Sequence, residues 1–141
     1  MNLNKILLGG VVGGVIYFLL GWLFYGMLMA DYYAANTNQC MMKPMADMNM
    51  LAMILSNLAG GFLLAFIIDW AKAADMMAGA KVAGIAALLM CLSFDLSFYS
   101  MSTMFSNITI LIVDVAAWTV MSAIAGAIVA MVMNMGTKKE A

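Results

Sequence analysis

Long apolar segments alternate with short polar ones along the chain. The first apolar segment, residues 6–30, contains no charged side chain, and three more follow at about 48–68, 76–101 and 108–135. A membrane-crossing helix needs about 20 mostly apolar residues, and the first segment is longer than the about 7–15 residues of a signal-peptide core. The pattern therefore predicts an all-α fold, an integral membrane four-helix bundle, with residues 1–141 forming a single transmembrane domain.

Polar residues stand where the later spans are expected to begin. Asp47 precedes the second span, Asp75 the third, and Ser106 and Asn107 the fourth. A side-chain oxygen at the start of a helix accepts hydrogen bonds from backbone N–H groups that have no partner within the helix. We expect Asp47, Asp75 and either Ser106 or Asn107 to be N-caps.

The composition agrees with a membrane protein. Apolar residues make up 67% of the chain and charged residues 9%, against about 45–50% and about 25% in a soluble domain. These values exclude a soluble domain, a disordered chain and a nucleic-acid binder. The chain also has no His and no Arg, which excludes His-based catalysis, His metal ligands and recognition of phosphate by Arg.

The lysines predict how the chain is oriented. Only Lys43 falls in a segment that lies outside when both termini are inside. The cytoplasmic segments then hold the other lysines, which are Lys5, Lys72, Lys81, Lys138 and Lys139. Because cytoplasmic loops are enriched in Lys and Arg, we predict an N-in, C-in orientation with both termini cytoplasmic. The lipid bilayer is then the main partner of the chain.

Glycines line one face of the first span. Gly10, Gly14 and Gly21 share this face with Tyr17 and Tyr25, and Gly61 lies on the second span. Small residues let helices approach closely inside a membrane, where hydrophobicity does not drive their association. We expect Gly10, Gly14, Gly21 and Gly61 to form helix-packing contacts, within the chain, in a homo-oligomer or with another membrane protein. A glycine-lined permeation path is the alternative.

Two carboxylic acids fall inside predicted spans. Asp95 precedes the outer end of the third span by about six residues, and Asp114 follows the start of the fourth by about six. At ~1.5 Å per residue both lie roughly 9 Å deep, on consecutive antiparallel helices. Asn57 and Tyr25 fall in the same outer half. We therefore take Asp95, Asp114, Asn57 and Tyr25 as a candidate polar or ion site.

Three interpretations of these acids stay open. The pair could bind a cation or share a proton in a pocket open to the outside, since intramembrane acids usually face protein or water. Alternatively, each could accept hydrogen bonds from Tyr, Ser or Asn and specify helix pairing, or reach interfacial water. No Lys or Arg lies near either acid in sequence as a counter-ion, which favours a protonated acid or a bound cation.

Other chemical signals are weak. Cys40, Met41, Met45 and Met48 make the outer loop a candidate for capturing Cu(I), which prefers soft sulfur ligands. Methionine is spread over the whole chain, however, and it also packs well in place of Leu. A cysteine without a nearby His lacks the usual activating base, and Cys40 and Cys91 differ too much in predicted depth for a disulfide. We expect no metal centre, no cofactor and no enzymatic activity.

The end of the first span carries a family resemblance. Residues 18–26 read Phe-Leu-Leu-Gly-Trp-Leu-Phe-Tyr-Gly, which resembles the first-helix signature of small bacterial four-span membrane proteins grouped as DUF1761. The resemblance implies a bacterial inner-membrane location and no particular activity. The sequence thus favours a non-catalytic structural or interaction subunit that packs through its glycine face. The alternative is a small proton- or cation-linked transporter or channel that uses the paired acids.

Overall fold

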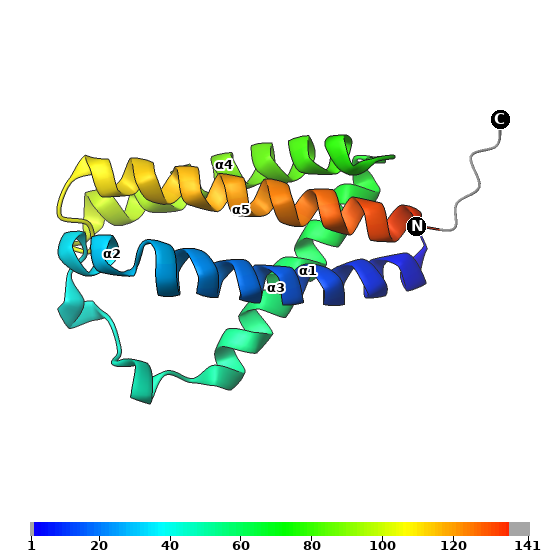
Figure 1. Ribbon diagram of the computed structural model, residues 1–141. Coiled ribbons are helices and arrows are strands. Elements are labelled where there is room, and N and C mark those ends of the chain that lie inside the picture. Colours follow the sequence, from blue (N-terminus) through cyan, green and yellow to red (C-terminus); the bar gives the residue numbers. More distant parts are fainter. Residues whose placement is uncertain (1, 136–141) are drawn as a thin grey trace.

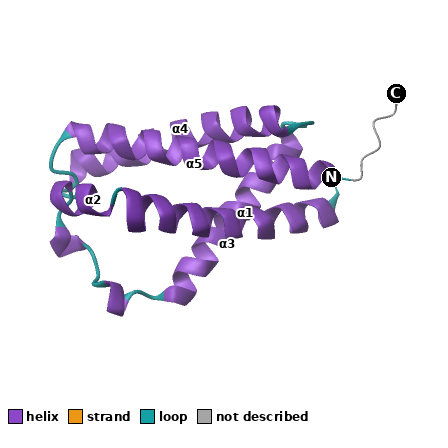
Figure 2. Ribbon diagram, viewed as in Figure 1, coloured by secondary structure: helices purple, strands orange, loops and turns teal. Residues whose placement is uncertain are grey.

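The computed structural model describes residues 2–135, apart from the side chain of Met45. These residues form an all-α protein (Figures 1 and 2). Its α-helices are α1 (Leu3–Leu23), α2 (Ala30–Asn36), α3 (Met50–Trp70), α4 (Met76–Met101) and α5 (Ile108–Asn134). A π-helical segment, Phe24–Leu28, extends α1, and 3-10 turns at Gln39–Met41 and Met45–Asp47 lie between α2 and α3.

Four helices are long and apolar enough to cross a membrane, as the hydropathy pattern predicted. They are Leu3–Leu28, Met50–Trp70, Met76–Met101 and Ile108–Asn134. The chain therefore has the architecture of a multi-pass membrane protein. The first of these helices ends before the predicted Ala30, because the backbone leaves the helical region at Met29 (φ −118°, ψ 7°). A separate short helix, α2, begins there.

The helix starts follow the predicted caps in two of three cases. The Asp75 side chain accepts from the Ala78 N–H at 2.8 Å, and Asn107 caps α5. The prediction for Asp47 is wrong, because Asp47 lies in a 3-10 turn and α3 starts only at Met50. The cap of α3 is Asn49, whose side chain accepts from the Ala52 N–H at 3.0 Å.

Three of the four long helices run side by side, and α3 crosses them obliquely (Figure 1). The contacts join α4 to α5, α1 to α3 and α1 to α5. The C-terminal half of α3 packs in the core through Leu64, Ala65 and Ile68. Its N-terminal half diverges from α1 and α4 (Figure 1). The helices therefore converge at the end where α1 begins and α5 finishes.

Glycines allow the closest of these approaches. A Cβ atom added to Gly13 would lie 3.0 Å from the Gly61 Cα, and one on Gly14 would lie 2.9 Å from the Leu58 Cα. A Cβ atom on Gly61 would overlap the α1 backbone at Gly10 and Gly14. The glycine face of α1 is therefore used within the chain, against α3.

Gly21 makes no close helix contact within the described part of the chain. A Cβ atom on Gly21 would meet nothing within 4 Å, because α3 has already diverged from α1 at that level. A second close approach joins α4 to α5, where a Cβ atom on Gly126 would lie 3.2 Å from the Gly79 carbonyl carbon. The periodicity of the first span gave no indication of this second contact.

Candidate functional site

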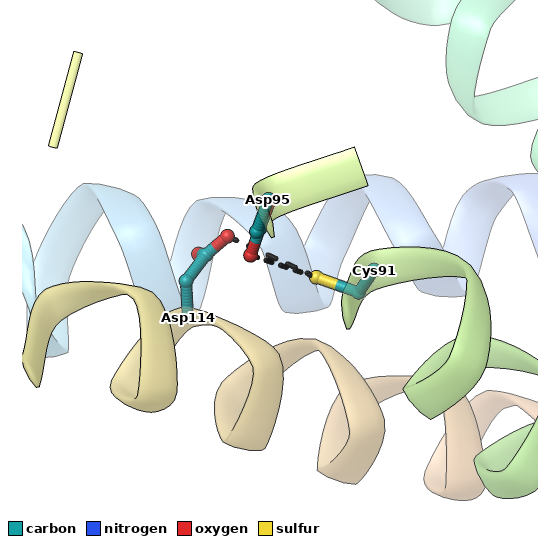
Figure 3. A group of neighbouring side chains, drawn as sticks. All are labelled: Cys91, Asp95 and Asp114. Atoms are coloured by element: carbon teal, nitrogen blue, oxygen red, sulfur yellow. Dashed lines mark hydrogen bonds between the residues drawn. The ribbon is translucent and has the colours of Figure 1, made fainter. Parts of the chain in front are cut away.

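Asp95 on α4 and Asp114 on α5 face each other, with Cys91 beside them (Figure 3). The Cys91 thiol lies 3.3 Å from Asp95 Oδ2 and 3.9 Å from Asp114 Oδ2. One oxygen of each carboxyl group and the Cys91 sulfur all lie within 4.8 Å of one another. We call these three residues the acid–thiol cluster.

The local sequence explains why the cluster forms. The connection between α4 and α5 is residues 102–107, so the two helices are antiparallel neighbours. Asp95 lies six residues before the last residue of α4, and Asp114 lies six residues after the first residue of α5. Both acids therefore reach the same level. Cys91 precedes Asp95 by four residues, which places both on one face of α4.

Two tyrosines donate hydrogen bonds to Asp114. The Tyr25 hydroxyl, from the π-helical end of α1, lies 2.8 Å from Asp114 Oδ1. The Tyr33 hydroxyl, from α2, donates to the same oxygen. The two rings meet edge to face, with centroids 5.0 Å apart. Asp114 Oδ1 is thus held by two phenols, while Oδ2 points toward Cys91 and Asp95.

The two carboxyl groups have different surroundings. Asp95 is only 7% exposed, and Cys91 is its hydrogen-bond donor. Within residues 2–135, no hydrogen-bond donor from outside the acid–thiol cluster reaches Asp95. Asp114 is half-buried and has the two tyrosine donors. Burial raises the pKa of the Tyr33 hydroxyl well above its ordinary value, and the hydrogen bond to Asp114 raises this pKa further. Tyr33 is therefore a neutral donor at physiological pH.

The segment that follows α2 is tied to the α4–α5 connection. The Asn38 N–H donates to the Met104 carbonyl at 2.9 Å, and the Ser106 N–H donates to the Asn36 carbonyl at 3.0 Å. Between these bonds, Thr37 pairs with Phe105 in an antiparallel bridge. These bonds hold α2 against the connection between α4 and α5. Tyr33 consequently contacts Asp114 from the side of this connection.

The structure separates Asn57 from the other predicted site residues. Its Nδ2 atom donates to the Met53 carbonyl of the same helix at 2.8 Å. Asn57 lines a different hollow, of about 240 Å³, between α3 and α4. Tyr17 and Trp118 line it as well, with their rings stacked 5.5 Å apart. Asn57 is displaced because α3 crosses the other helices obliquely.

Two members of the site were not predicted. Cys91 could have been found from its spacing of four residues to Asp95, which is a same-face spacing on any helix. Tyr33 carried no such signal, because residues 30–47 had no assigned structure and the fold alone brings α2 over α5. Sequence spacing thus finds partners on one helix more easily than partners across the fold.

The methionine-rich segment between α2 and α3 has a different environment from the acid–thiol cluster. Cys40, Met41 and Met48 are exposed, and Cys40 forms no disulfide. The side chain of Met45 lies outside the described part of the chain. The loop therefore gives no buried sulfur cluster among the described side chains, and Cu(I) capture there stays a prediction from sequence.

Comparison with known proteins adds no assignment. No family model, curated protein or solved structure matches the chain. The resemblance to DUF1761 proteins stays a prediction. The site itself consists of two carboxyl groups, a thiol and two phenols inside a largely apolar protein.

Proposed function

We propose that this chain is a small membrane protein that binds a cation between Asp95 and Asp114 and exchanges it with the outer side. It would thus be a small proton- or cation-linked transporter or channel. The observation that carries the proposal is the convergence of the two intramembrane carboxyl groups, with the Cys91 thiol, at one point. No enzymatic step is part of the proposal.

The energetics of burial support a cation. An acidic residue near the centre of a membrane helix costs about 2.5–3.5 kcal/mol on insertion scales. Two acids placed together repel each other unless a positive charge or a shared proton lies between them. The chain offers no basic residue for this role, because it has no Arg and no Lys from residue 82 to residue 137. A proton or a metal ion is the remaining source of positive charge.

The proposed orientation puts the site near the outer face. Lys5 and Lys72 line one hollow at the end of the molecule where α1 begins, and Lys43 lies in the connection between α2 and α3 at the other end. This distribution supports an N-in, C-in bundle. The proposed location in a bacterial inner membrane rests on the resemblance of residues 18–26 to DUF1761 proteins. Lys138 and Lys139, which also entered the prediction, lie outside the described residues.

A flux assay tests the proposal. Protein reconstituted in liposomes is given a pH gradient or a gradient of Na⁺, K⁺ or Zn²⁺, and flux is followed with an internal indicator dye. Asp95→Asn and Asp114→Asn should each abolish the flux. The matched control is Asp31→Asn, an exposed acid on α2, which should leave it intact. Wild-type flux in both site variants would refute the proposal.

The second candidate function is a non-catalytic structural or interaction subunit. The outer half of α3 diverges from α1 and α4 and exposes apolar side chains, including Leu51, Ile54 and Leu55. A homo-oligomer or another membrane protein could pack there, whereas Gly10, Gly14 and Gly61 are already used within the chain. Light scattering in detergent tests this candidate, because a monomer would argue against self-association.

A further inference from the structure

The acid–thiol cluster contains a donor set that selects among cations. We infer that the cation bound there is a thiophilic divalent metal ion such as Zn²⁺, with Cys91, Asp95 and Asp114 as its protein ligands. This inference rests on the proposed function and specifies its cation. It gives Cys91 the role of a metal ligand, whereas the hypothesis from sequence used the two acids alone.

The distances in the cluster fit tetrahedral coordination. Zinc lies about 2.3 Å from a cysteine sulfur and about 2.0–2.2 Å from a carboxylate oxygen. In a tetrahedron these bond lengths place sulfur and oxygen about 3.6 Å apart. The Cys91 sulfur lies 3.3 Å from Asp95 Oδ2 and 3.9 Å from Asp114 Oδ2. Small side-chain rotations would complete the coordination without moving either helix.

The burial of Asp95 is a second observation that points to a ligand. Asp95 is 93% buried, since 7% of it is exposed. A carboxyl group with a purely structural role at this depth needs strong donors, because burying it without them is costly. Asp114 has such donors in Tyr25 and Tyr33. Among the described residues, the partners of the Asp95 carboxyl group all lie within the acid–thiol cluster: the Cys91 thiol, which is a weak donor, and Asp114. A metal ion bound in the cluster would take the place of these contacts.

The thiol decides which metal is favoured. Carboxylate and water oxygens alone suit Mg²⁺ and Ca²⁺, whereas a thiolate selects Zn²⁺ and other soft or borderline ions. When the metal binds, the Cys91 sulfur gives up its proton to water and forms the metal–sulfur bond. Three protein ligands leave the fourth position to a water molecule, whereas a structural zinc site is closed by four protein ligands.

Cobalt substitution tests the inference on the full chain in detergent. The chain has two cysteines, so Cys40→Ser leaves Cys91 as the single thiol. Titration of this variant with Co²⁺ should produce a sulfur-to-cobalt charge-transfer absorption that saturates at one equivalent and disappears when Zn²⁺ is added. Cys91→Ser should lack the absorption. Asp95→Asn in the Cys40→Ser background should weaken Co²⁺ binding by at least about 10-fold.

The outcomes separate the metal inference from the proposed function. If Co²⁺ and Zn²⁺ do not bind to the folded Cys40→Ser protein, the metal inference is overturned, although proton flux lost in Asp95→Asn would still support the proposed function. Absorption that survives Cys91→Ser and vanishes in Cys40→Ser also overturns it, because the metal is then at the outer loop. Metal binding at Cys91 without any flux supports the metal site and overturns the proposed exchange of the cation with the outer side.

Circular dichroism of each variant serves as the folding control. If Cys91→Ser does not fold, the near-isosteric Asp95→Asn serves as the second variant.

Discussion

The Tyr33 hydroxyl donates a hydrogen bond to Asp114 Oδ1 across 81 residues of sequence. Tyr33 belongs to α2, which follows the first span, whereas Asp114 lies inside the last span. The contact therefore joins a segment outside the spans to the acid–thiol cluster. Because the segment that contains α2 is also bonded to residues 102–107, Tyr33 is held against Asp114.

Removing the Tyr33 hydroxyl should weaken the contact between α2 and Asp114. Tyr33→Phe keeps the ring and deletes the donor, so Asp114 keeps only the Tyr25 hydrogen bond. A hydrogen bond to a charged group contributes about 1.5–3 kcal/mol, and we expect the half-buried site to lose stability near the lower value. Unfolding in mixed detergent micelles measures the loss. Tyr32→Phe, at an exposed neighbour, is the control, and equal effects of the two variants would contradict the prediction.

The stability of the protein should also depend on Tyr33 at high pH. Burial raises the pKa of Tyr33 in the folded state above the ordinary value of about 10. Above about pH 10 the unfolded chain releases this proton while the folded chain keeps it, so rising pH favours unfolding. The stability advantage of wild type over Tyr33→Phe should be complete below about pH 10 and shrink above it. The comparison is made by detergent unfolding at several pH values, and a constant difference across this range would exclude the effect.

Gly61 should tolerate no side chain. A Cβ atom there overlaps the α1 backbone at Gly10 and Gly14, and a backbone cannot turn aside as a flexible side chain can. Overpacking typically costs about 1–3 kcal/mol, so Gly61→Ala should destabilise the protein by this amount or more. Gly21→Ala is the matched control, because nothing lies within 4 Å of that Cβ position. Unfolding measurements that rank the two variants equally would show that the α1–α3 contact is not tight.

The cap of α3 gives a test of the corrected helix start. Asn49→Ala removes the side-chain oxygen that accepts from the Ala52 N–H, and loss of an N-cap costs about 1 kcal/mol. Asp47→Ala should have a much smaller effect, since Asp47 lies in the preceding 3-10 turn. The two free energies of unfolding decide between the caps. A larger loss in Asp47→Ala would restore the expectation from sequence.

Thiol labelling tests the proposed orientation. Cys40 is exposed and Cys91 is buried, so a membrane-impermeant maleimide should react with Cys40 alone. In intact spheroplasts, wild type should be labelled from outside and Cys40→Ser should not. Labelling of Cys40 only after lysis would place the outer loop in the cytoplasm and reverse the orientation.

The sequence by itself determined the four long helices and the level of the two acids. Hydropathy is a local property, and about 20 apolar residues are enough to define a span. Asp95 and Asp114 meet because two antiparallel helices joined by a short connection keep a simple register. This register depends only on the number of residues between each acid and the connection.

Only the tertiary structure decided which other residues join the acids. Asn57 was expected there but lies elsewhere, because α3 crosses the other helices at an angle that the packing of Gly61 on α1 allows. Tyr33 reaches Asp114 because α2 is bonded to the α4–α5 connection. A crossing angle and a contact between distant segments depend on side chains from several helices at once. A local pattern in one segment does not contain that information, so the site became complete only in the folded chain.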